Sequence, residues 1–112
     1  MARRAQRRDA NERGIIDALT AIGCSVDQLD GGNGRPDLLI GEPRNHENIL
    51  IEIKIPGEHL NPLQRMYHNN HKGRIHVVDN IHDALSVVYW YWERRANLSE
   101  KKVRQEAGAP GA

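Results

Sequence analysis

The chain has 112 residues and a mass of 12.7 kDa, which is enough for one small domain with a modest core. Hydrophobic residues make up 38% and charged residues 28% of it, a balance typical of a polar globular protein rather than a disordered or fibrous one. No apolar stretch approaches the ~20 residues that span a bilayer, and no apolar segment follows the basic first residues, so we expect neither a membrane span nor a secretory signal. The single cysteine, Cys24, excludes an intramolecular disulfide and favours the cytoplasm.

The net charge of +1 is unevenly distributed along the chain. Residues 1–13 carry +3, residues 14–92 carry −4 and residues 93–112 carry +2. Basic ends around an acidic centre suit a protein that binds a polyanion at its flanks and cations at its centre. The alternative is a pair of solvated termini. We expect a basic tail over residues 1–10, a single domain over 11–95, and a basic, flexible tail over 96–112.

The first half of the chain predicts one helix and three strands. Apolar residues recur at helical spacing from about Asn11 to Ile22, where Gly23 ends the helix. Short apolar runs predict strands over 25–29 and 38–40, on either side of a glycine-rich loop over 30–34. Over residues 49–55, four isoleucines alternate with Leu50, Glu52 and Lys54. This period of two predicts a strand with the isoleucines in the core and the two charged residues on its other face.

The second half predicts a helix, a strand and a final helix. Asn61 followed by Pro62 has the composition of a helix N-cap and first turn. Residues 75–78 predict a strand, and a last helix runs from near Asn80 toward Arg95. The whole order predicts an α/β fold with a mixed β-sheet of about four strands, flanked by helices on both faces.

Three charged residues in the predicted strands point to chemistry. If the strands before and after residues 42–45 pair as a hairpin, Asp37 lies beside Glu52, and two such carboxylates repel unless a cation lies between them. Mg²⁺ or Mn²⁺ suits such oxygen ligands, and Lys54 could orient or deprotonate a metal-bound water for phosphodiester hydrolysis. The glycines before Asp37 would leave room for a ligand. The alternative is a solvated strand face with a surface ion pair, but an isoleucine-rich central strand needs a reason to bury charges.

The same residues carry a resemblance to a known family. Gly34-Arg35-Pro36-Asp37, followed fifteen residues later by Glu52-Ile53-Lys54 and then by Gln64, resembles the PD-(D/E)XK nuclease superfamily. More narrowly, it resembles the small stand-alone VRR-NUC proteins of phages and bacteria, over about residues 12–88. The resemblance implies a restriction-endonuclease-like core and a Mg²⁺- or Mn²⁺-dependent DNA endonuclease, with junction, flap or branched DNA among its candidate substrates. The alternative is a non-catalytic nucleic-acid-binding module on the same fold.

The resemblance also implies metal ligands. Asp37 and Glu52 would bind the ion together with the Ile53 carbonyl, and Glu12 would be an additional acidic ligand. For Glu12, a simpler role is also open, because an acidic residue favours the first turn of its helix by charge alone.

Two further residues take roles in the reaction by resemblance. Lys54 would act on the attacking water, and Gln64 would contact the metal-bound water or the scissile phosphate. Gln64 is also three residues after Asn61, the spacing of a capping box, so one side chain could serve the helix, the chemistry or both. The expected DNA-binding residues are Arg35, Arg65, Arg94 and Arg95.

Residues 89–92, Tyr-Trp-Tyr-Trp, hold four of the chain's five aromatic side chains. On a helix they face all sides, so some of them must be exposed unless a partner covers them. We expect a homodimer contact through this helix. The alternative is a base-stacking platform beside Arg94 and Arg95.

Overall fold

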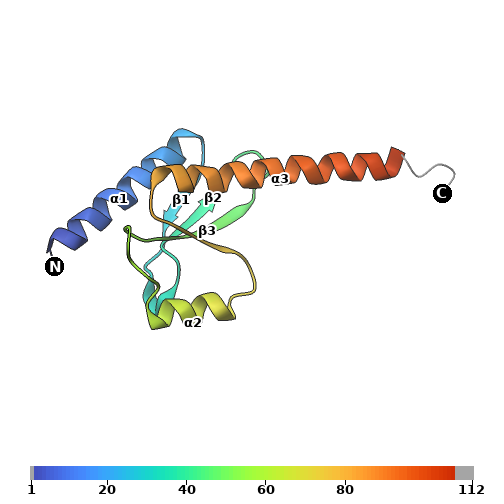
Figure 1. The fold of residues 1–112 in the computed structure, drawn as a ribbon. Coiled ribbons are helices and arrows are strands. Elements are labelled where there is room, and N and C mark those ends of the chain that lie inside the picture. The colour runs from blue at the N-terminus through green and yellow to red at the C-terminus, as the bar shows by residue number, and fades with distance from the viewer. Residues whose placement is uncertain (1, 108–112) are drawn as a thin grey trace.

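A computed structural model describes the backbone of residues 2–107 and the side chains of residues 8–94. Three α-helices run in this part of the chain, together with a short 3₁₀ turn and four strands (Figure 1). In order, they are α1 (Ala2–Ala21), β1 (Ser25–Gln28), η1 (Gly32–Gly34), β2 (Leu38–Gly41), β3 (Asn48–Ile53), α2 (Pro62–Asn70), β4 (Ile75–Val78) and α3 (Ile81–Ala107).

The four strands form one mixed sheet in the order β1-β2-β3-β4. β1 with β2, and β2 with β3, are antiparallel neighbours, whereas β3 and β4 are parallel. A parallel pair needs a crossover connection, and α2 supplies it. The predicted α/β fold with a four-stranded mixed sheet is confirmed, and β3 lies in the interior of the sheet, as the isoleucine pattern indicated.

The alternating isoleucines of β3 define the core. Ile49, Ile51 and Ile53 are buried on the face that α1 and α3 cover together (Figure 1). Each such side chain contributes about 1.5–3 kcal/mol when it leaves water. α2 lies apart from these two helices, against η1, and its Gln64 reaches Glu52 near the end of β3 (Figure 1). Glu52 therefore meets a side chain of α2 rather than the isoleucine core.

The two outer helices are longer than the apolar pattern predicted. α1 begins at Ala2 rather than near Asn11, and α3 ends at Ala107 rather than near Arg95. Both added segments are rich in alanine, arginine, lysine and glutamine, which are strong helix formers, but they lack an apolar stripe. Most of the backbone that we expected to form tails is thus helical. Within residues 2–107, no helix combines the length and the apolar character needed to cross a membrane.

Candidate active site

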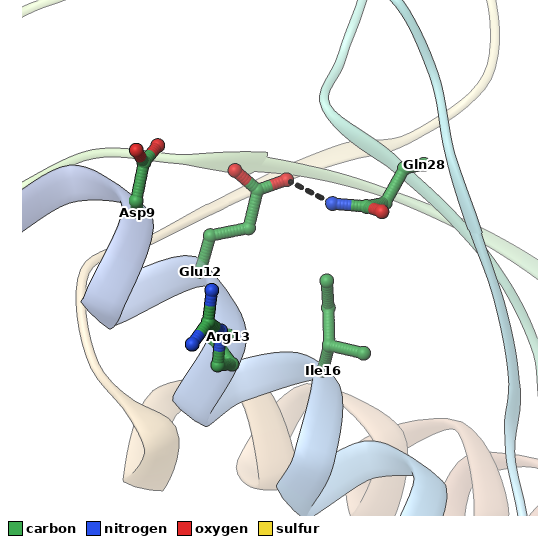
Figure 2. Close-up of a pocket in the computed structure, with 5 residues that line it drawn as sticks. All are labelled: Asp9, Glu12, Arg13, Ile16 and Gln28. Carbon is green, nitrogen blue, oxygen red and sulfur yellow. Dashed lines mark hydrogen bonds between the residues drawn. The ribbon is translucent and has the colours of Figure 1, made fainter. Parts of the chain in front are cut away.

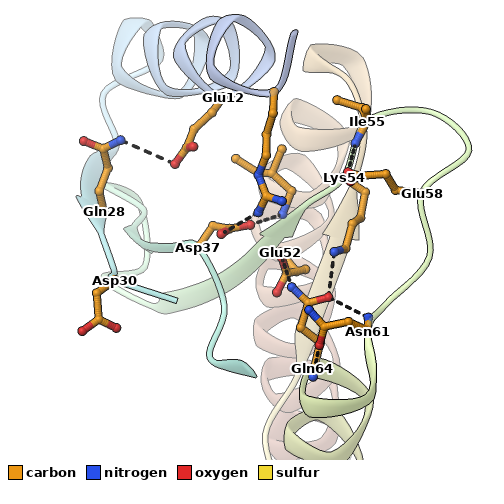
Figure 3. Close-up of polar contacts among 12 residues, drawn as sticks. Glu12, Gln28, Asp30, Asp37, Glu52, Lys54, Ile55, Glu58, Asn61 and Gln64 are labelled. Atoms are coloured by element: carbon orange, nitrogen blue, oxygen red, sulfur yellow. Dashed lines mark hydrogen bonds and ion pairs between the residues drawn. The ribbon is translucent and has the colours of Figure 1, made fainter. Parts of the chain in front are cut away.

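Asp37 lies directly before β2, where the β2–β3 ladder ends. Its backbone N–H donates to the Ile51 carbonyl at 3.1 Å, and its Oδ2 accepts the Ile53 N–H at 2.7 Å. The Asp37 carboxylate thus accepts the Ile53 N–H of β3, as the carbonyl of a neighbouring strand would do. Because the register pairs Leu38 with Ile51, Asp37 lies opposite Glu52, and the structure brings together the two acidic residues that the sequence singled out (Figure 3).

Glu52 is a fully buried carboxyl group with incomplete hydrogen bonding. Its side chain is 0% exposed. Oε2 accepts from Gln64 Nε2 at 3.3 Å, whereas Oε1 is buried and accepts no hydrogen bond from the described part of the chain. Burial raises the pKa of Glu52 to about 8, together with a hydrogen bond from the protonated carboxyl group to Asp37 and the negative charge of Asp37, against the opposing attraction of Lys54 and Arg8. A buried oxygen without a partner costs about 1–3 kcal/mol, so it marks a place where a ligand would be stabilised.

Lys54 and Gln64 complete the buried polar group at the end of β3. Lys54 is 6% exposed, and its Nζ donates to Gln64 Oε1 at 2.7 Å (Figure 3). The same amide reaches Glu52, so Gln64 bridges the ammonium and the carboxyl group. Gln64 Oε1 also accepts from Asn61 N–H at 3.0 Å, and Asn61 Oδ1 accepts from Gln64 N–H at 2.9 Å. The capping box is therefore present, and one side chain serves both the helix and the site.

Helix α1 places a second set of side chains over the site. Arg8, Asn11 and Glu12 share one face of the helix, as residues three and four apart do. Arg8 Nη2 lies 3.4 Å from Asp37 Oδ1. Asn11 Nδ2 donates to the carbonyls of Lys54 at 3.3 Å and of Asp79 at 3.0 Å, which ties α1 to the ends of β3 and β4. Sequence reasoning missed Arg8 and Asn11, and the only signal for them is their helical spacing from Glu12.

Glu12 itself points toward β1. Its Oε1 accepts from Gln28 Nε2 at 3.4 Å (Figures 2 and 3). The two residues line a pocket of about 360 Å³ together with Asp9, Arg13 and Ile16 (Figure 2). The structure thus gives Glu12 a polar neighbour on β1, and its role as a metal ligand stays a prediction.

Gly34 explains how the Gly-Arg-Pro-Asp segment meets α2. Its φ is +79°, and a Cβ built there would lie 2.3 Å from the Leu63 carbonyl oxygen and 2.8 Å from Gln64 N. Only glycine fits so close an approach of two backbones at a positive φ. The room that we expected for a ligand at this glycine is taken by the first turn of α2. Gly34 therefore helps to hold Gln64 near the loop that carries Asp37.

The predicted DNA-binding arginines whose side chains are described have partners other than Asp37 and Glu52. Arg35 Nε donates to a carbonyl of its own loop at 2.9 Å, and Arg65 Nη1 donates to a carbonyl in the segment before α2 at 3.1 Å; both side chains are exposed. Arg94 Cζ lies 5.3 Å from the centroid of the Trp90 ring. The Arg95 side chain falls outside the described residues. DNA binding by these four residues stays a prediction.

The aromatic run on α3 is divided between the core and the surface. Tyr91 is buried with its hydroxyl 2.9 Å from His76 Nε2, and Trp92 Nε1 donates to the buried carboxylate of Glu42. Tyr89 and Trp90 remain 45% and 41% exposed. The expectation that part of this run is exposed is confirmed, and the homodimer contact is not tested by it.

The donor set at the end of β3 fits a divalent cation. It comprises the carboxylates of Asp37 and Glu52 and the Ile53 carbonyl, all of them oxygen ligands of the kind that Mg²⁺ and Mn²⁺ prefer. Among the described residues, no group of three or more His, Cys, Asp or Glu side chains is arranged to hold a metal. A two-carboxylate site suits Mg²⁺, which keeps several waters of its own. The unpartnered Glu52 Oε1 supports the fit, because a cation there would satisfy it.

Comparisons with known proteins give the fold a relative. A solved structure described as a VRR_NUC domain matches with a TM-score of 0.62 and 21% sequence identity. The match covers 76% of this chain and 97% of that chain. The sequence matches neither a family model nor a curated protein. The chain therefore has the fold of a VRR_NUC domain, and the function has to be argued from its site.

Proposed function

We propose that this protein is a Mg²⁺- or Mn²⁺-dependent DNA endonuclease that hydrolyses phosphodiester bonds. The observation that carries the proposal is the meeting of Asp37, Glu52 and Lys54 at the end of β3, around a buried Glu52 oxygen that accepts no hydrogen bond from the described part of the chain. The likeness to a VRR_NUC domain supports it at the level of fold. The proposal also agrees with the resemblance of the sequence to the PD-(D/E)XK pattern.

Two carboxylates and a backbone carbonyl would hold the metal. Asp37 is fixed by the Ile53 N–H, and Glu52 is fixed by Gln64, so both side chains are preorganised. A divalent ion bound there would supply positive charge to the phosphate as the transition state develops.

Lys54 would position the attacking water. Its ammonium is held by Gln64 at 2.7 Å, and its backbone is held by Asn11 and by β4. An ammonium donates hydrogen bonds only, so it orients a water by donating to the oxygen, or to a hydroxide once the proton has left. Gln64 would act as a positioning residue for Lys54, and its contact with Glu52 couples the two groups.

The finer parts of the proposal concern the substrate and the assembly. We propose junction, flap or other branched DNA as the preferred substrate. The side chains proposed to contact DNA are basic: Arg35, Arg65, Arg94 and Arg95. We also propose a homodimer formed through Tyr89 and Trp90. The cytoplasm of a bacterial or phage-infected cell is the proposed location. Static light scattering on the Trp90→Ala variant tests the dimer: a dimeric parent that becomes monomeric supports it, and a monomeric parent rejects it.

Cleavage assays test the activity. Supercoiled, linear and branched DNA are incubated with the protein in Mg²⁺, Mn²⁺ or EDTA, beside the Asp37→Ala and Lys54→Ala variants. We expect cleavage that requires metal and is lost in both variants while their circular dichroism spectra match the parent. A parent that binds DNA without cutting it in either metal would favour the non-catalytic binding module.

A further inference from the structure

Arg8 is a cation beside the carboxylate pair that no motif in the sequence includes. Its Nη2 lies 3.4 Å from Asp37 Oδ1. The Arg8 side chain is 35% exposed and the Asp37 side chain 15% exposed. The guanidinium therefore lies at the boundary between the buried site and the solvent, where a group that enters from solvent can reach it.

The contact with Asp37 leaves Arg8 free to change partners. A charge-assisted N–H···O bond is typically about 2.7–2.9 Å long, so 3.4 Å is a loose ion pair. A guanidinium has five N–H donors, and this pair uses one of them. A divalent cation bound by Asp37 would repel the guanidinium, because both are positive and the site is partly screened from water.

The charges of the site leave a place for one anionic group. Asp37 and Glu52 face two cations, Lys54 and Arg8, so these four groups balance, and a divalent cation bound between the carboxylates would leave a positive charge for a phosphate to offset. Lys54 is buried and bonded to Gln64, so Arg8 is the cation that an incoming group can reach. The planar guanidinium fork matches the oxygen atoms of a phosphate, and it does so better than an ammonium.

We propose that Arg8 binds the phosphate of the DNA strand that enters the site, and that Asp37 holds this arginine ready in the metal-free protein. The inference rests on the proposed function and deepens it, since it adds a phosphate-binding residue from α1 to the groups at the end of β3. Asn11, on the same face of α1, fixes the helix against Lys54 and Asp79 and so keeps Arg8 over the site.

DNA binding without cleavage is the first test. The affinity for a short duplex and for a branched DNA is measured by fluorescence anisotropy with Mn²⁺ at several salt concentrations, in a Lys54→Ala background that keeps the DNA intact. Adding Arg8→Ala is expected to weaken binding about tenfold, the effect of one lost charge-assisted hydrogen bond, and to reduce the slope of log K against log salt by about one. Arg8→Lys should keep the slope and recover part of the affinity.

The matched control is Lys72→Ala, which removes one exposed positive charge beyond the far end of α2. It should change binding less than Arg8→Ala does. Equal losses for the two variants would show that Arg8 acts only through the overall charge of the protein, and an unchanged salt slope in Arg8→Ala would show that it contacts no phosphate. Either result would overturn the proposal.

Manganese binding in the absence of DNA gives a readout that is independent of cleavage. Because Arg8 competes with the ion for Asp37, Arg8→Ala should bind Mn²⁺ at least as tightly as the parent in a calorimetric titration. Weaker Mn²⁺ binding would mean that Arg8 serves only to hold Asp37 in place, and the proposal would fail. A parent that cuts no DNA would instead reject the proposed function, while both binding measurements would still decide the role of Arg8.

Discussion

Replacing Gln64 with alanine removes several hydrogen bonds at once, and the structure allows their sizes to be separated. The Gln64 side chain accepts from Asn61 N–H and from Lys54 Nζ, and it donates to Glu52. Losing one half of the capping box costs about 1 kcal/mol. Leaving the buried Lys54 ammonium without this acceptor costs about 1–3 kcal/mol more, so Gln64→Ala should lower the free energy of unfolding by about 2–4 kcal/mol.

The matched variant is Asn61→Ala, which removes the other half of the same capping box and leaves Lys54 and Glu52 untouched. It should cost about 1 kcal/mol. Urea denaturation of both variants and the parent, followed by circular dichroism, measures the difference. If Gln64→Ala is no more destabilising than Asn61→Ala, the bridge from Gln64 to Lys54 contributes nothing, and the claim that α2 organises the site is refuted.

Three further perturbations test other parts of the structure. Gly34→Ala should lower the free energy of unfolding by more than the ~1–2 kcal/mol that a left-handed residue costs alone, because its Cβ would meet α2. Gly57→Ala, at φ +90° with open space around it, should show only this backbone cost. Equal losses of stability for the two variants in urea denaturation would contradict the close approach at Gly34. Metal binding at pH 7 should release close to one proton, because the pKa of Glu52 is raised to about 8 and its carboxyl group is largely protonated before the ion binds. Calorimetry in buffers of different ionisation enthalpy measures the number of protons released. A value near zero would contradict the prediction. The same raised pKa predicts that the metal-free protein loses stability as the pH rises from about 4.5 through 8, because over this range the folded state binds a proton that the unfolded state has released. Glu52→Gln should remove this loss. Melting temperatures of the variant and the parent that change alike with pH would contradict the prediction.

The sheet could be predicted from the sequence because its signals are local. The alternation of isoleucine with Glu52 and Lys54 is a direct consequence of the two faces of a strand. The hairpin between β2 and β3 then places Asp37 opposite Glu52, and both steps need only a period and a turn. The carboxylate pair was predicted as a site for the same reason, since two adjacent carboxylates repel each other and a cation between them relieves the repulsion.

The contacts made by α1 could not be predicted in this way. Arg8 and Asn11 reach Asp37 and Lys54 because the helix crosses the end of the sheet, and neither residue lies in the apolar stripe that revealed the helix. The helix ends were missed because propensity without an apolar face gives no pattern to follow. Gly34 was read as space for a ligand, since nothing in the sequence shows that the first turn of α2 fills it.

The location of a bound Mn²⁺ ion tests the central claim most directly. In crystals soaked with Mn²⁺, anomalous scattering locates the ion without reference to any assay of activity. The account predicts one peak within coordination distance of the Asp37 and Glu52 carboxylates and the Ile53 carbonyl, lost in the Glu52→Gln variant. A peak held by other residues, or no peak in the parent at saturating Mn²⁺, would contradict it.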